Sequence, residues 1–293
     1  MGQPEQRAEG AGPFVTRRTW RRPGGESVVW ESRTARRRGT VAVRPPGAAP
    51  SRQASADAVS VGRLRRLNAV AATAFVIGGA LFAAGAGVSL SGAGARECAS
   101  VYFAGGLFFN TGGYVSLLQV VNAPVHAEGR LVTPRWRWWS YEPMRVDWLG
   151  AFVLFAGTLV FAANLIDSFL RGLSVRQINR LVWTPDVIGC VLFLVSGHLG
   201  FTEICHRGLP CVRTRSLGWW IVAVNQLGSV LFMVSALAAF TRPATGGLVN
   251  ADIADWGTLT GALCFSVGGL LQLRAPLTGP LRVVVRRPAA TGR

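Results

Sequence analysis

The sequence predicts an all-α integral membrane protein, a bundle of six transmembrane helices built as three tandem helical hairpins, preceded by a disordered basic N-terminal tail. Half of the 293 residues are hydrophobic and only 15% are charged, against about 25% in soluble domains. A bilayer core about 30 Å thick needs about 20 apolar residues in a helix. Six runs meet this length: 67–89, 99–121, 148–168, 182–204, 218–240 and 255–273. They lack the polar face of a surface helix, which disfavours a soluble helical core.

The segment before the first run is strongly basic. The chain has a net charge of +17, and all 31 of its basic residues are arginine. Residues 1–66 hold 14 arginines and 5 acidic residues, interspersed with Gly, Pro, Ser and Ala. Such a segment cannot bury enough apolar surface to offset its ordering entropy. The sequence therefore predicts a disordered cytoplasmic tail over residues 1–66.

Two alternatives remain for this tail besides a segment with no specific partner. It can adsorb to anionic lipid headgroups, where each basic residue near the surface contributes about 1 kcal/mol. Specific nucleic-acid binding is not expected, since Trp20 and Trp30 are the only large stacking aromatics among the arginines. Translation can also begin downstream, near Val59 or Val61.

The arginines of the short loops predict the orientation of the bundle. With the N-terminal tail inside, the inner loops and C-terminal segment hold 12 arginines and the outer loops hold 5. Cytoplasmic loops carry the excess of basic residues. We therefore expect both termini, including the short basic tail 275–293, to lie on the cytoplasmic side of the cell membrane. The outer loop 169–181 is the exception, with three arginines.

Each run contains the same Gly-x-x-x-Phe motif near its middle. The pairs are Gly78/Phe82, Gly105/Phe109, Gly157/Phe161, Gly189/Phe193, Gly228/Phe232 and Gly261/Phe265. A small or small-polar residue follows each Phe by three positions: Gly85, Gly112, Asn164, Ser196, Ser235 and Gly268. Positions i, i+4 and i+7 lie on one helical face.

We interpret this stripe as the packing seam of the bundle, because small residues let membrane helices approach closely. The Phe of one helix would fill the hollow over the Gly of a neighbour. A pore lined by phenylalanine is the functional alternative. The three hairpins would share one orientation, which indicates duplication of a two-helix unit and parallel repetition.

Several of these segments carry a resemblance to a known family. The segment Phe155-Ala-Gly-Thr-Leu-Val-Phe161, the segment Gly228-Ser-Val-Leu-Phe232 and the motif Val146-Asp-Trp-Leu-Gly150 are similar to the YrhK-type membrane domain. The layout over residues 64–274 resembles actinobacterial six-helix proteins carrying that domain. The resemblance implies a fold and a membrane location but no activity and no active-site residues.

Polar groups inside a membrane are costly and are candidates for function. The candidates are Asn110, Asn164, His198, Glu203, Asn225 and Gln226. Asn164 and Asn225 lie on the Gly/Phe stripe, so we expect them to form interhelical hydrogen bonds. His198 has no visible relay partner, and a structural role is favoured for it. A proton-coupled path through Asn110, His198 and Glu203 is the alternative.

A second group of candidates follows the fourth run. Cys205, His206 and Cys211 can provide zinc ligands, although their spacing matches no standard zinc pattern. A disulfide between the two cysteines is expected if their loop is extracellular, and free thiols or a labile redox pair if it is cytoplasmic. The absence of any specific role is the simplest interpretation.

The sequence contains no Gly-rich phosphate loop, no His-Glu-x-x-His and no Gly-x-Ser-x-Gly. We therefore expect no enzymatic activity and no cofactor. The leading expectation is a structural or accessory protein of the cytoplasmic membrane whose main partner is the lipid bilayer, with self-association left open. The alternatives are a small-solute or ion permease and, less favoured, a redox or metal-binding membrane protein.

Overall fold

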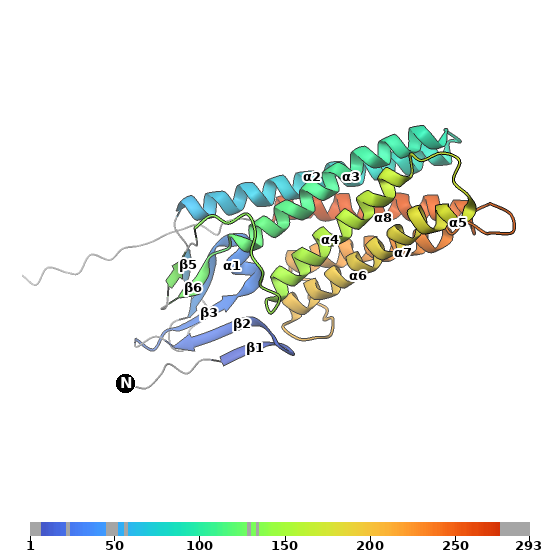
Figure 1. The fold of residues 1–293 in the computed structure, drawn as a ribbon. Coiled ribbons are helices and arrows are strands. Elements are labelled where there is room, and N and C mark those ends of the chain that lie inside the picture. The colour runs from blue at the N-terminus through green and yellow to red at the C-terminus, as the bar shows by residue number, and fades with distance from the viewer. Residues whose placement is uncertain are drawn as a thin grey trace, which may run out of the picture.

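Six long helices form an elongated bundle in the computed structural model, which describes residues 7–21, 24–44, 52–55, 58–127, 130–132 and 135–275 (Figure 1). The long helices are α2 (Ala58–Leu90), α3 (Ala95–Val121), α4 (Val146–Asp167), α6 (Thr184–Cys205), α7 (Leu217–Ala238) and α8 (Ala251–Arg274). A short helix, α5 (Val175–Ile178), and a π-helical turn over Asn179–Trp183 lead directly into α6. Of the predicted basic tail 275–293, all but the first residue lies outside the described residues.

The long helices pack as a closed ring. Each contacts the next long helix along the chain, and α8 returns to pack against α2. The first, third and fifth long helices run away from the N-terminal sheet, and the other three return toward it (Figure 1). The loops that follow α3 and α6, and the end of α8, therefore lie at the same end of the bundle as the sheet.

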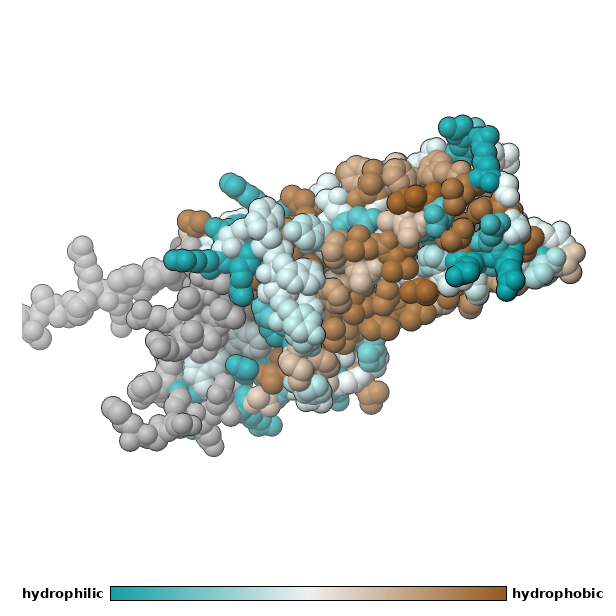
Figure 2. All heavy atoms as spheres, in the orientation of Figure 1, coloured by the Kyte–Doolittle hydropathy of each residue, from teal (hydrophilic) through white to brown (hydrophobic). Residues whose placement is uncertain are grey.

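In the described part of the chain, five helical segments are long and apolar enough to cross a membrane. They are α2, α4, the continuous segment Val175–Cys205, α7 and α8. The helix α3 is not among them, although it has 27 residues. Its sequence is less apolar and includes Arg96, Glu97, Asn110 and Gln119. Apolar side chains cover the middle of the bundle and hydrophilic ones gather toward its ends (Figure 2). These features suggest a membrane-embedded, multi-pass protein.

The prediction of a disordered N-terminal tail is wrong for most of residues 7–55. This segment forms a five-stranded antiparallel sheet in which each strand pairs with the next, in the order β1-β2-β3-β4-β5. The strands are β1 (Arg7–Ala11), β2 (Phe14–Arg21), β3 (Ser27–Glu31), β4 (Thr40–Arg44) and β5 (Arg52–Ser55). A helix, α1 (Ser32–Arg38), connects β3 to β4. A further two-stranded sheet pairs β6 (Val125–Ala127) with β7 (Arg130–Val132).

A small apolar core explains why this arginine-rich segment folds. Trp20, Val28, Val41 and Val43 are buried together from β2, β3 and β4. The strands are only 4–8 residues long, so each contains only two to four repeats of a period-two pattern. Arginines of β2 lie beside acidic residues of its neighbours, and Arg17 pairs with Glu9 of β1 and Glu31 of β3. The sheet gains the rest of its support from contacts of β1 and β2 with α6 and of β2 with α4.

Candidate functional site

The helix α1 carries serine and arginine side chains to one end of the bundle. Ser32 and Arg36 are four residues apart, as are Arg33 and Arg37, so each pair shares a helical face. Gly39 ends the helix in the left-handed conformation (φ 61°), and its N–H donates to the carbonyl of Ala35. This C-cap favours glycine because a Cβ is disfavoured there. The helix contacts α2, α3 and α6.

Glu203, near the end of α6, lies buried under α1. Its Oε1 accepts hydrogen bonds from Ser32 Oγ and Arg36 Nη2, both at 3.0 Å. Its Oε2 accepts from Arg36 Nη2 at 2.8 Å and from Arg33 Nη1 at 3.2 Å. Burial lowers the pKa of the Arg33 guanidinium, and the Glu203 carboxylate opposes that shift. Two guanidinium groups therefore share one carboxylate.

A third arginine continues this polar cluster. Arg37 Nη2 donates to Gln272 Oε1 of α8 at 3.2 Å, and Gln272 Nε2 donates to Asn68 Oδ1 of α2 at 3.1 Å. On another side, Asp147 at the start of α4 pairs with Arg145, with 2.7 Å between Nη2 and Oδ2. Arg145 also pairs with Glu142, whereas Glu203 pairs with Arg33 and Arg36 of α1.

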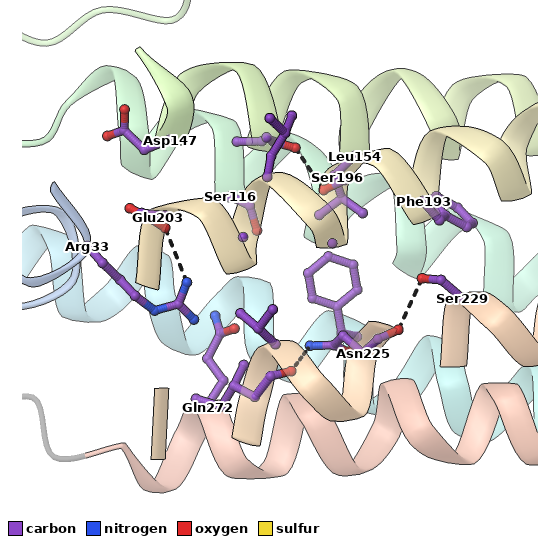
Figure 3. Close-up of a pocket in the computed structure, with 18 of the residues that line it drawn as sticks. Arg33, Ser116, Asp147, Leu154, Phe193, Ser196, Glu203, Asn225, Ser229 and Gln272 are labelled. Carbon is purple, nitrogen blue, oxygen red and sulfur yellow. Dashed lines mark hydrogen bonds and ion pairs between the residues drawn. The ribbon is translucent and has the colours of Figure 1, made fainter. Parts of the chain in front are cut away.

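Beneath α1 a cavity of about 140 Å³ enters the bundle. Arg33 and Glu203 lie at one end of it, and Phe193 and Ser229 lie toward the middle of the bundle (Figure 3). Polar lining comes from Ser116, Ser196, Asn225, Ser229 and Gln272 besides the ionic residues. Apolar lining includes Phe75, Leu154, Phe193, Val222 and Phe265.

A second, outer hollow lies on the other side of α1. It has a volume of about 440 Å³ and shares Arg33, Arg37 and Glu203 with the inner cavity. Arg213 and Arg215 of the loop between α6 and α7 also line it, together with Glu31. The arginines of α1 therefore separate the inner cavity from an outer, basic groove.

The inner cavity ends at a layer of phenylalanine rings. All six Phe residues of the Gly-x-x-x-Phe motif belong to this layer, with neighbouring ring centroids 5.2–6.3 Å apart. Phe193 and Phe265 line the inner cavity. Only a void of about 10 Å³ lies within the layer, which is about the space that one water molecule needs.

The motif glycines receive these rings. A Cβ added to Gly78 would lie 2.7 Å from the Phe109 ring, and one added to Gly105 would lie 2.8 Å from the Phe82 ring. The same reciprocal contacts join α4 to α6 and α7 to α8, through Gly157/Phe193, Gly189/Phe161, Gly228/Phe265 and Gly261/Phe232. The stripe thus packs helices in pairs and directs six rings to one level of the bundle.

A third cavity, of about 220 Å³, lies on the far side of the phenylalanine layer. Phe82, Phe161 and Phe232 form its boundary with the layer. Polar groups line it as well: Asn164, Ser168, Asp186, Ser235, Asp255 and Thr258. Two cavities that carry polar side chains in their walls therefore approach the layer from opposite ends.

The structure brings together only some of the predicted intramembrane polar residues. Glu203 and Asn225 line the inner cavity, whereas Asn164 lines the far one. Asn110 Nδ2 donates to the Gly106 carbonyl within its own helix at 3.0 Å, and Asn225 Nδ2 likewise donates to the Ile221 carbonyl at 2.8 Å. His198 is exposed on α6, and Gln226 packs against Gly197. Asn110, His198 and Glu203 therefore do not form one path.

The cysteine and histidine candidates lie at the end of α6 beside the N-terminal sheet. Cys205 and Cys211 form a disulfide with a Cα–Cα distance of 5.6 Å, and in this oxidised state neither offers a thiolate to a metal. His206 Nδ1 lies 2.9 Å from Thr16 Oγ1 of β2, and its Nε2 lies 3.9 Å from Glu31 Oε1. Within the described residues, no group of three His, Cys, Asp or Glu side chains could hold a metal ion.

The arginines and the serine of α1 are not among the residues that the sequence predicts for a site, because its composition indicates disorder over residues 1–66. A usable signal was present in the spacing of Ser32, Arg33, Arg36 and Arg37. A second signal was Glu203 at the end of an apolar helix, because a buried carboxylate needs a paired cation. The two signals together would have predicted a contact between residues 32–37 and the fourth apolar run.

Comparison with known proteins adds no relative to these observations: the chain matches no protein-family model, no curated protein and no solved structure.

Proposed function

We propose that this protein is a six-span protein of the cytoplasmic membrane, made of three tandem helical hairpins, whose bundle is a closed pathway for small solutes. The observation that carries the proposal is the pair of polar-lined cavities on opposite sides of the phenylalanine layer. A scaffold needs a packed bundle but no polar cavities along its axis. The cavities thus favour the permease alternative over the purely structural one.

The phenylalanine layer is suited to act as a gate. Hydrophobic constrictions in channels close by excluding water, and the void within this layer is only about 10 Å³. Each of the six rings is positioned by its contact with a glycine of the paired helix. A small shift between helix pairs would therefore open or close the layer. A non-enzymatic role belongs to the same proposal.

Six spans and the tandem-hairpin arrangement are also part of this proposal. The helix α3 packs between α2 and α4 in the closed ring, so it would share their environment even though it is less apolar. The resemblance to the YrhK-type domain stays within the proposal as well. Its support is that Phe161 and Gly228 of the resembling segments lie in the glycine–phenylalanine contacts.

The test is solute flux through the full-length protein reconstituted in liposomes, with glycerol, methylammonium and benzenesulfonate as probes. Phe109 lies in the layer, and its sequence neighbour Phe108 is exposed on the outside of α3. We expect Phe109→Ala to raise the flux of at least one probe by about tenfold, equivalent to lowering a barrier by about 1.4 kcal/mol. Phe108→Ala is the matched control and should leave flux unchanged.

Equal, protein-independent flux for the wild type and both variants would favour the structural role. Both variants must remain monodisperse in detergent before reconstitution, because removing a buried Phe costs about 3–5 kcal/mol of stability. If Phe109→Ala does not fold, Phe109→Leu serves in its place, since it shortens the ring side chain but keeps most of its volume.

A further inference from the structure

We infer that the inner cavity binds a small organic anion, a carboxylate with a short apolar tail. This inference rests on the proposed function and names the substrate class of the pathway. The arginines of α1 would hold the carboxylate, and the apolar walls beneath them would hold the tail.

The charge at the cavity mouth favours an anion. Arg33, Arg36 and Arg37 line the cavity, and Glu203 is the carboxylate that pairs with the first two of them. Three arginines and two carboxylates, Glu203 and Asp147, line the cavity, so its lining keeps a net positive charge. The outer groove adds Arg213 and Arg215 along the approach, and such a basic entrance raises the local concentration of anions.

Of the three arginines that line the cavity, Arg36 is the one whose residue is buried. Arg36 is 8% exposed, and its Nη2 serves both oxygens of Glu203. Its Nε is buried and has no hydrogen-bond partner among the described residues. A guanidinium fork suits the planar oxygens of a carboxylate.

The rest of the cavity determines the size and polarity of the ligand tail that fits. Phe75, Leu154, Phe193, Val222 and Phe265 line it below the arginines. Its volume of about 140 Å³ compares with that of an engineered protein cavity of about 150 Å³ that binds benzene. A ligand with a single anionic head and a tail no larger than one aromatic ring fits both parts. Benzoate is therefore the probe of choice.

The experiment is calorimetric titration of the purified full-length protein in detergent with benzoate. We expect wild-type protein to bind benzoate and not benzyl alcohol or benzylamine, which keep the ring but lack the negative charge. Laurate, whose tail exceeds the cavity, should not displace benzoate. Tighter binding of laurate would instead indicate a site for lipid-derived acids and would overturn the inference, as would equal binding of benzyl alcohol.

Two variants test the binding of the anionic head and of the apolar tail of the ligand separately. Arg36→Gln should weaken benzoate binding by roughly tenfold to a hundredfold, the effect of losing a charged hydrogen bond. Arg96→Gln, at the exposed opposite end of the bundle, is the matched control and should bind normally. If Arg36→Gln does not fold, Leu154→Trp fills the tail region and keeps the arginines, so it should abolish benzoate binding.

Unchanged benzoate binding in a folded Arg36→Gln or Leu154→Trp variant would overturn the inference. The proposed function fails separately. Benzoate binding without flux of any probe would leave the anion site standing and remove the pathway. Flux of glycerol or methylammonium without benzoate binding would leave the pathway and remove the anion site.

Discussion

At the scale of single residues, the stability of the bundle depends on where a glycine can take no side chain. Gly78 and Gly87 lie in the same helix, α2, but differ in their surroundings. A Cβ on Gly78 would lie 2.7 Å from the Phe109 ring and 3.1 Å from the Gly105 carbonyl oxygen, whereas one on Gly87 would meet nothing within 4 Å. The backbone contact cannot relax as a flexible side chain would.

We expect Gly78→Ala to lower the free energy of unfolding by about 1–3 kcal/mol, the usual cost of overpacking. Gly87→Ala should be neutral or stabilising by up to about 1 kcal/mol, because alanine is the better helix former. Thermal unfolding of both variants in detergent measures the difference. Equal midpoints would show that the close glycine–phenylalanine contact does not limit the packing of α2 against α3.

At the scale of elements, the N-terminal sheet is held to the end of α6 through His206. Burial lowers the pKa of His206, and the charges of Arg213 and Arg17 lower it further, while Glu31 and Glu9 oppose the shift. The folded state thus favours the neutral ring. The contribution of His206 is fully present above its unfolded pKa of about 6.5 and is lost as the pH falls below that value.

Acidification from about pH 7.5 to about pH 5.5 should therefore weaken the attachment of β1 and β2, since this range spans the unfolded His pKa. Limited proteolysis of residues 7–31 in the intact protein should accelerate over this range. The variant His206→Asn keeps a residue type that tolerates the left-handed conformation found at this position (φ 55°), and it does not titrate. Its proteolysis rate should not change with pH. Parallel acceleration in both proteins would assign the effect to another group.

The elements differ in how well the sequence predicted them. Residues 67–89 and 255–273 were predicted as helices, and α2 and α8 contain them with longer ends, because about 20 consecutive apolar residues are a strong signal. The sheet was missed because Val41 and Val43 give only one repeat of a strand pattern. Its fold depends on contacts with residues more than 150 positions away, such as that of Thr16 with His206, and no local pattern reports these.

In the candidate site, too, the residues with a local sequence signal could be predicted, and the features that depend on distant contacts could not. Glu203 and Asn225 could be selected because polar groups stand out in apolar runs. The cavity they line could not be predicted, because it also requires α1 to close it and Phe193 and Phe265 to end it. His198 was selected by the same rule but is exposed on α6, since helical phase alone does not fix which face meets the bundle interior.

At the scale of the whole molecule, two features of one end of the bundle favour opposite orientations. The N-terminal sheet, the outer basic groove and the Cys205–Cys211 disulfide all lie there (Figure 1). Disulfides persist in oxidising compartments outside the cytoplasm, whereas arginine-rich segments are retained inside it. The arginine bias acts while the helices insert, and the disulfide forms only after its loop has reached a compartment. We therefore expect the arginines to determine the orientation of the bundle. This end would then be cytoplasmic, and the cysteine pair would be reduced in growing cells.

Labelling of intact cells with a membrane-impermeant thiol reagent measures this orientation. In a variant that retains Cys211 as the only cysteine, we expect labelling only after lysis. Ser91→Cys in the same background places a thiol in the exposed turn between α2 and α3, at the opposite end of the bundle, and should label in intact cells. The reverse pattern would place the sheet and the basic groove outside the cell, where the disulfide would be permanent. The anion cavity would then open to the exterior and take its ligand from there, so this pair of variants also determines from which side the pathway is loaded.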